Sequence, residues 1–219
     1  MASADQGPRL RAVSDLAPAR WIESRTGDFH AGVHALLPSG FAAYARVLHP
    51  VEASGGTFLR WAEAAERAGR PLHSRVRFAD IAAGAGDAEP WQGSFEAELL
   101  PALCEVLSAH TTTPEACYLG LWDGWGWLTA DGPRVHLSGR AYLLYEGPVE
   151  AATDLGDRGA GCFLPQSPNL WWPRDRAWCV ATDVDLDSTY VGGPASLIEE
   201  LTGSSRLEAV RAELSDPLS

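Results

Sequence analysis

The sequence contains no lysine, so all 17 of its cationic side chains are arginines, and it has one asparagine, Asn169. With 29 acidic residues the formal net charge is −12 at pH 7. A nucleic-acid backbone requires a positive surface on its protein, so this deficit of cations argues against generic DNA or RNA binding. The same charge suits docking on a basic protein partner.

Long apolar runs are also missing. No stretch approaches the roughly 18 apolar residues that a membrane-spanning helix requires. Residues 1–8 lack the basic start and the apolar stretch of a secretory signal. We therefore expect a cytoplasmic protein without membrane association.

Cysteine is scarce. Cys104, Cys117, Cys162 and Cys179 form no C-x-x-C pair, and their wide spacing fits neither a disulfide framework nor a zinc site. We expect buried, reduced thiols. The G-x-S-x-G, G-x-G-x-x-G and P-loop motifs are absent as well, so no cofactor is predicted and no catalytic residue is assigned.

What is present indicates one globular unit. The 219 residues are 46% hydrophobic, which is ordinary for a globular chain. Residues 1–28 are mixed polar and small, and we expect a flexible N-terminal arm there. Residues 29–219 are predicted to form a single domain. Strand patterns come in runs rather than alternating with long helices, which favours an α+β fold with an antiparallel β-meander packed against a few helices.

Four helices are expected. Thr57 is a favourable N-cap for a helix over 57–68, and Ser205-x-x-Glu208 is a capping box that predicts a last helix over 205–214. Apolar periodicity predicts a further helix over 96–110, and Pro194 suits the first turn of a helix over 194–201.

The expected strands follow from short apolar runs between turn signals. Asp123-Gly124 predicts a hairpin turn, and Ser138-Gly139 separates two further strands. The predicted strands are 33–37, 41–51, 117–122, 125–129, 135–137, 140–145 and 178–186.

Three acids, Asp183, Asp185 and Asp187, alternate with apolar residues. On a strand their carboxylates would share one face, where a divalent metal or a basic partner could bridge them. The EF-hand pattern fails, since Ser188 and Pro194 occupy the positions of its glycine and its glutamate. A solvated sheet face is the alternative interpretation.

Nine tryptophans are many for this length, and several lie near arginines. Tandem Trp171 and Trp172 cannot both face one core in an extended chain, so one of them is expected to be exposed or to line a pocket. An arginine among apolar residues, such as Arg46, is either a paired structural residue or an anion contact. The candidate ligand- or partner-binding residues are Arg46, Trp122, Trp171, Trp172 and Arg174.

Four segments carry a family resemblance. They are Pro38–Pro50 (PSGFAAYARVLHP), Trp122–Gly124, Tyr142–Pro148 and Pro168–Gly193 (PNLWWPRDRAWCVATDVDLDSTYVGG). Together they resemble a family of uncharacterised actinobacterial proteins, over most of the chain after about residue 33. The resemblance implies a GC-rich genome, which agrees with the composition. It implies no activity and transfers no functional residue.

The leading functional hypothesis is an acidic interaction protein, of the immunity or antitoxin kind, that docks a basic protein partner. The alternative is a small-molecule-binding protein or enzyme with a pocket lined by tryptophan and arginine. A third interpretation is a homodimer with tryptophans in its interface.

Overall fold

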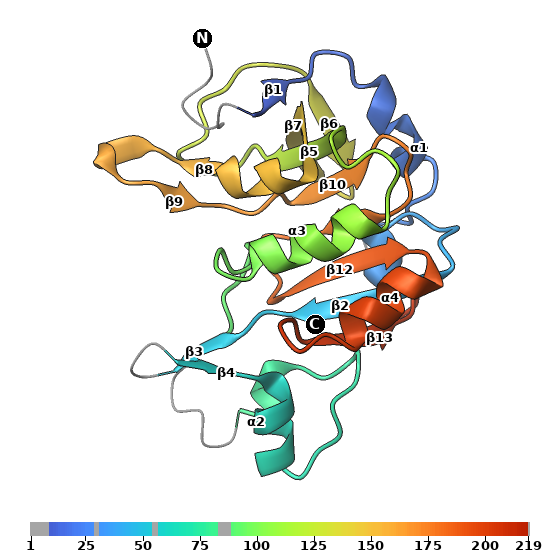
Figure 1. The fold of residues 1–219 in the computed structure, drawn as a ribbon, viewed down its shortest axis with the longest axis vertical. Helices are drawn as coiled ribbons and strands as arrows, with labels where there is room; N and C mark the ends of the chain where they lie inside the picture. Colours follow the sequence, from blue (N-terminus) through green and yellow to red (C-terminus); the bar gives the residue numbers. More distant parts are fainter. Residues whose placement is uncertain (1–8, 29–30, 54–56, 83–88, 219) are drawn as a thin grey trace.

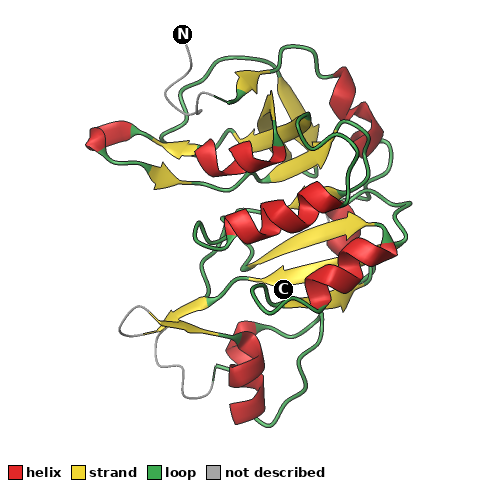
Figure 2. Cartoon of the chain, in the orientation of Figure 1, coloured by secondary structure: helices red, strands yellow, loops and turns green. Residues whose placement is uncertain are grey.

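One nine-stranded sheet runs through the molecule in the computed structural model, which describes residues 9–28, 31–53, 57–82 and 89–218 (Figure 1, Figure 2). Each neighbouring strand pair is antiparallel. The α+β class and the antiparallel sheet predicted from the sequence are confirmed.

The sheet joins distant parts of the chain, because β2 lies between β12 and β13. The sheet order is β1 (Arg11–Ala12), β7 (Arg140–Gly147), β5 (Cys117–Trp122), β10 (Leu170–Pro173), β11 (Cys179–Ala181), β12 (Ser188–Gly193), β2 (Ala43–Leu48) and β13 (Ala209–Ala212), and β6 (Arg134–Leu137) pairs with β7. Consecutive β10, β11 and β12 form the meander.

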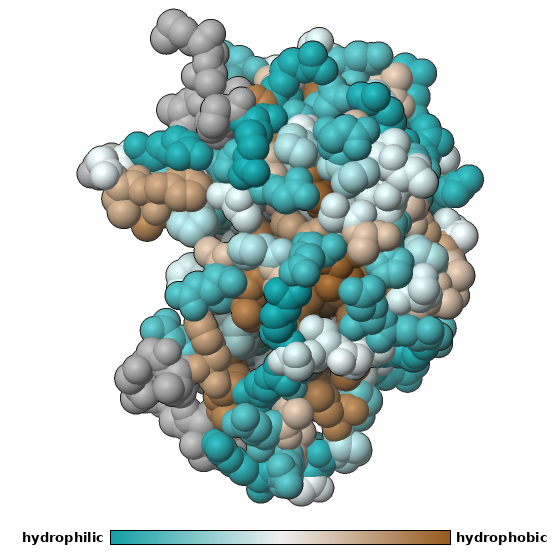
Figure 3. All heavy atoms as spheres, viewed as in Figure 1, coloured by the Kyte–Doolittle hydropathy of each residue, from teal (hydrophilic) through white to brown (hydrophobic). Residues whose placement is uncertain are grey.

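Two small ribbons project from this sheet. They are the β3–β4 hairpin (Val51–Ala53 and Thr57–Leu59) and the β8–β9 ribbon (Gly156–Asp157 and Leu164–Pro165). In Figure 1 both project to the left, one below and one above the end of α3. Their separation leaves an open notch on this side of the molecule (Figure 3).

Helices cover both faces of the sheet. The α-helices are α1 (Arg20–Glu23), α2 (Trp61–Arg67), α3 (Leu100–Ala109) and α4 (Ala195–Thr202), and the 3₁₀ helices are η1 (Ala17–Ala19), η2 (Gly32–Ala35), η3 (Phe78–Asp80), η4 (Val149–Asp154) and η5 (Gly159–Gly161). Among the described residues no helix has the length and apolar character needed to span a bilayer.

Residue alternation on β10 sends the tandem tryptophans to opposite faces. Trp171 packs in the core cluster that contains buried residues of α3 and α4, and Trp172 in the cluster that contains buried residues of α1 and η2. Each is 1% exposed. They do not share one core, as expected, but the expectation that one is exposed is wrong, because helices cover both faces of the sheet.

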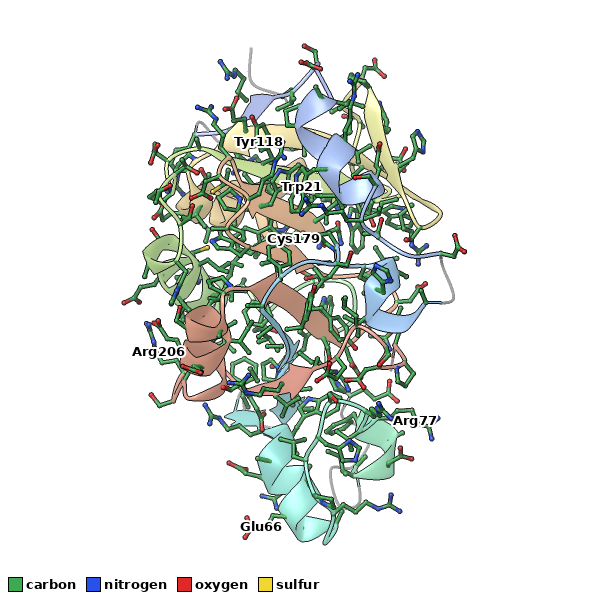
Figure 4. The ribbon with its side chains drawn as sticks, turned by 90° about the vertical axis from the view of Figure 1, so that its right-hand side faces the viewer. Trp21, Glu66, Arg77, Tyr118, Cys179 and Arg206 are labelled. Carbon is green, nitrogen blue, oxygen red and sulfur yellow. The ribbon has the colours of Figure 1, made fainter. Side chains whose placement is uncertain are left out.

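The N-terminal region is packed from residue 9 onward. β1 pairs with β7, and Ile22 is completely buried in the same cluster as Trp172. Figure 4 shows Trp21 in the interior near Tyr118 and Cys179. Residues 9–28 therefore differ from the expected loose arm, because they cover a sheet face that would otherwise be exposed. Residues 1–8 lie outside the described residues.

Of the helix predictions, one is wrong at its start and another is wrong altogether. Thr57 lies on β4, so α2 begins only at Trp61, and the segment predicted as the last helix forms β13. The carboxylate of Glu208 accepts hydrogen bonds from the amides of Trp61 (2.8 Å) and Ala62 (2.7 Å). This residue therefore caps α2, a distant helix, rather than a helix of its own.

The predicted strand over 125–129 is also absent. The chain does turn at Asp123-Gly124, but both sides of β5 are already occupied by β7 and β10. The indole of Trp125 instead donates to the side-chain oxygen of Asn169, at 3.1 Å. Residues 33–37, another predicted strand, are mostly the 3₁₀ helix η2. The Ser138-Gly139 turn between β6 and β7 is confirmed, with positive φ at both residues.

Three of the four cysteines are buried and free, as expected, and Cys162 is exposed on the β8–β9 ribbon. Burial raises the pKa of the Cys104 and Cys117 thiols to about 12 and also raises that of Cys179. Of the four thiols, only the exposed Cys162 is open to a reagent in solvent.

Candidate functional site

The notch between the two ribbons contains a cavity of about 550 Å³, which we call the acidic cleft. One wall comes from β3 and the residues before it, and the opposite wall from β9. The loop over residues 89–97 forms the rest, together with Trp127. Figure 3 shows this hollow on the left of the molecule, with apolar surface along the lower edge of the upper ribbon.

Four carboxylates line the acidic cleft: Glu52, Glu89, Glu96 and Asp157. None of them forms an ion pair with an arginine or histidine in the part of the chain that the structure describes. Burial, with the nearby charges of Glu98 and Glu52, raises the pKa of Glu96. The cleft is therefore short of positive charge, and a cation would relieve its repulsion.

Exposed apolar side chains accompany these acids. The side chain of Trp91 is 66% exposed and that of Leu164 is 60% exposed, and both line the acidic cleft. A large apolar group left in water beside a concave surface is a feature of binding sites. An indole face also binds cations through its ring quadrupole, which suits the same cationic ligand.

A buried histidine holds the loop that carries Trp91. The Nδ1–H of His49 donates to the carbonyl of Trp91 at 2.7 Å, and Nε2 lies 2.9 Å from the hydroxyl of Thr189. Burial, with the nearby charge of Arg46, lowers the pKa of His49 to about 4 despite the hydrogen bond to Trp91. The ring is therefore neutral at pH 7, and Nε2 accepts from Thr189.

Further hydrogen bonds join this loop to the opposite wall. The amide of Phe95 donates to the side-chain hydroxyl of Ser167 at 2.8 Å, and the amide of Ser167 donates to the side-chain hydroxyl of Ser94 at 3.0 Å. The side-chain amide of Gln166 donates to the carbonyl of Gly93 at 3.1 Å. These buried bonds hold the two walls at a fixed separation, so the acidic cleft is preformed.

A second cavity, of about 640 Å³, lies over the sheet face that carries Trp172, and we call it the sheet cavity. Its lining is mostly apolar and includes Leu36, Leu137 and Leu170. This volume is within the range of small-molecule sites.

One side of the sheet cavity is formed by the C-terminal segment. The carbonyl of Asp216 accepts from the amide of Val33 at 3.0 Å, and its carboxylate pairs with Arg75 at 2.6 Å. Gly32 has a φ of 67°, and a Cβ there would lie 2.2 Å from the Asp216 carbonyl oxygen. Only glycine allows this close approach.

Asp183 and Asp185, two of the three acids predicted as a metal site, border this second cavity. The three carboxylates do not gather at one point. The segment is a turn rather than a strand, so they do not share a face. Asp183 and Asp185 both bind Arg140, at 3.0 and 2.5 Å, whereas Asp187 binds Arg46 at 3.1 Å. Within the described residues no group of three metal-ligating side chains is found. Arginines of the chain itself provide the counter-charge that a metal or a basic partner was expected to provide.

Arg46 occupies a structural position. It is fully buried and donates to the hydroxyl of Ser188 at 2.8 Å and to the carbonyls of Ser74 and Val76 at 3.0 and 2.7 Å. Its guanidinium also lies 5.0 Å from the ring centre of Trp61. It joins the main sheet to the lobe around α2, and neither cavity includes it.

The other candidate residues do not meet in one pocket. Trp122 is half-buried with Arg140 5.5 Å from its ring centre, and Arg174 pairs with Glu146 at the surface. Neither cavity is lined by Trp122, Trp171, Trp172 or Arg174. Neither of these two cavities is therefore the pocket of tryptophan and arginine that the alternative hypothesis expects.

The sequence reasoning missed the acidic cleft. Its acids come from segments more than 100 residues apart, Glu52 and Asp157 being the outermost, so no local pattern marks them. Trp91 follows Pro90 within a polar, glycine-rich stretch, where a core role is least expected. That isolated tryptophan is the one signal that could have indicated an exposed aromatic.

Comparisons of the chain with protein-family models, with curated proteins and with solved structures gave no match. The resemblance to an actinobacterial family therefore stays a prediction.

Proposed function

We propose that the protein is an interaction module that binds a basic segment of a partner protein in the acidic cleft. The observation that carries the proposal is the set of unpaired carboxylates around the exposed indole of Trp91. Other acids of this chain, such as Asp154 and Asp183, have arginine partners. A site kept free of internal counter-ions is suited to a cation that arrives from outside.

The shape of the acidic cleft favours an extended segment over a small ion. It is open, and its upper wall presents Leu164 beside the acids. A peptide that alternates arginine with an apolar residue could place guanidinium groups on the carboxylates and its apolar side chain against Trp91 and Leu164. We therefore take the partner segment to be arginine- or lysine-rich with an apolar anchor.

The exposed Cys162 allows a direct test, since a thiol-reactive fluorophore there reports on the nearby acidic cleft. An arginine-rich peptide with one central leucine should change the fluorescence, and its affinity should fall at least about tenfold from low to high salt. A peptide with glutamate in place of each arginine should not bind.

Matched variants localise the effect. Glu52→Gln with Glu96→Gln should weaken the peptide, whereas Glu66→Gln with Asp131→Asn removes the same charge from exposed positions outside the cleft and should not. A natural partner captured from the source lysate counts only if the first variant loses it and the second keeps it. Equal binding by both variants, or salt-independent binding, would overturn the proposal.

A further inference from the structure

One polar group that lines the sheet cavity makes no hydrogen bond within the described part of the chain. Tyr142 is 6% exposed and lines this cavity, and its hydroxyl makes no hydrogen bond to any described residue. Burial, with the negative charge of Asp183, raises the pKa of Tyr142, so the hydroxyl is protonated at pH 7. The hydroxyl therefore offers an unused donor and acceptor to a molecule in the cavity.

We propose that the sheet cavity binds a mostly apolar small molecule that carries a single amine, with the amine between Tyr142 and the Asp183–Arg140–Asp185 cluster. This site is separate from the acidic cleft and does not depend on the function proposed for it.

The apolar walls determine the body of the ligand. The space is surrounded by Leu36, Leu137, Leu170 and Leu186. Among the described residues that line it, the charged ones are Arg140, Asp183 and Asp185. Burying an aromatic or aliphatic body against such walls is the main source of affinity in a site of this size.

The charges determine the head group. One guanidinium faces two carboxylates, so the cluster has a net charge of −1 when all three are ionised. Both carboxylates contact the guanidinium of Arg140, and the side chain of Asp185 is still 77% exposed. An ammonium group can donate to this free carboxylate surface and to the Tyr142 oxygen. A ligand carboxylate would meet repulsion there.

The test uses defined probes, in matched sets that share an indolyl, a naphthyl or a decyl body and end in an amine, an alcohol or a carboxylate. Binding is followed by calorimetry and by amide chemical shifts of the labelled protein. We expect amines to bind at least about fivefold more tightly than the alcohols and carboxylates of the same body, with shifts at Leu137, Ser138 and Leu170.

Two variants distinguish a loss of binding caused by the missing Tyr142 hydroxyl from a loss caused by damage to the fold. Tyr142→Phe removes only the oxygen and should weaken the amines about three- to tenfold, with little change in melting temperature. Tyr118→Phe, on β5 and outside the cavity, is the matched control and should bind as the parent does. If no probe shifts the cavity amides, if carboxylates bind as tightly as amines, or if Tyr142→Phe has no effect, the proposal is wrong.

Discussion

Acidic residues have different surroundings in the two cavities. Around the sheet cavity, Asp183 and Asp185 both pair with Arg140, and the walls are mostly apolar. Around the acidic cleft, the charge of Glu52 acts on Glu96, and neither carboxylate forms an ion pair among the described residues. The carboxylates of the first region stabilise the fold, whereas those of the second act against it. A stretch of acids therefore indicates binding only where the fold supplies no counter-charge.

The largest expected effect concerns the histidine that supports the acidic cleft. His49 has a pKa of about 4 in the fold against about 6.5 when exposed, so the unfolded chain binds more protons between these values. The stability that the neutral His49 ring contributes to the fold is fully present above pH 6.5 and is lost as the pH falls towards 4. The free energy of unfolding should drop by up to about 3 kcal/mol over that range.

Chemical denaturation at a series of pH values measures this loss. His49→Gln should remove most of the slope between pH 6.5 and 4, although it also lowers stability at pH 7 because the buried network with Thr189 is broken. His136→Asn changes an exposed histidine and should retain the slope. A parent protein with no loss of stability over this range would show that His49 is not held neutral.

The next largest effect concerns the aspartates beside the sheet cavity, which are paired with Arg140. Asp183→Asn removes a partly buried carboxylate that accepts two hydrogen bonds from Arg140, at 3.0 and 3.1 Å. We expect a loss of about 1–2 kcal/mol at pH 7, measured by urea unfolding. Asp185→Asn is the matched control, and because that side chain is 77% exposed its loss should stay below about 0.5 kcal/mol. Equal losses would remove the distinction between the two acids.

The smallest effect has the opposite sign. The pKa of Glu96 is raised, so ionisation is disfavoured in the fold and the folded chain keeps this proton to a higher pH than the unfolded chain. At pH 7, Glu96→Gln should therefore stabilise the protein slightly, by about 0.3 kcal/mol, because solvent screens a half-buried group. Thermal unfolding at low salt shows the gain best, and high salt should reduce it. A clear loss of stability would mean that Glu96 has a structural partner.

Local patterns predicted several elements well. β5 matches the predicted strand over 117–122, and the helix expected over 96–110 contains α3. In both, the apolar spacing is that of the element itself, and the buried faces satisfy it. The prediction failed for residues 125–129, where an equally apolar run finds no free strand edge beside β5.

The candidate sites were harder to predict than the fold. Arg46 attracts notice as a charge among apolar residues, and it does have partners, whereas the aspartates were expected to share one face of a strand and lie on a turn instead. The partners, however, come from Ser188, Val76 and Arg140, which no local spacing connects to them. Most of the tryptophans pack in core clusters, on the two sheet faces and around α2, whereas Trp91 is exposed in the acidic cleft.

The sequence by itself determined the secondary-structure class, the charge and most strand positions, because alternation and turn chemistry act over a few residues. The tertiary structure alone decided which charges are paired. Glu208 caps α2 and Arg140 pairs with two aspartates across long sequence separations, while the acids of the cleft form no ion pair among the described residues. The physical reason is that electrostatic and hydrogen-bond energies depend on distance and burial in space, which the order of residues does not contain.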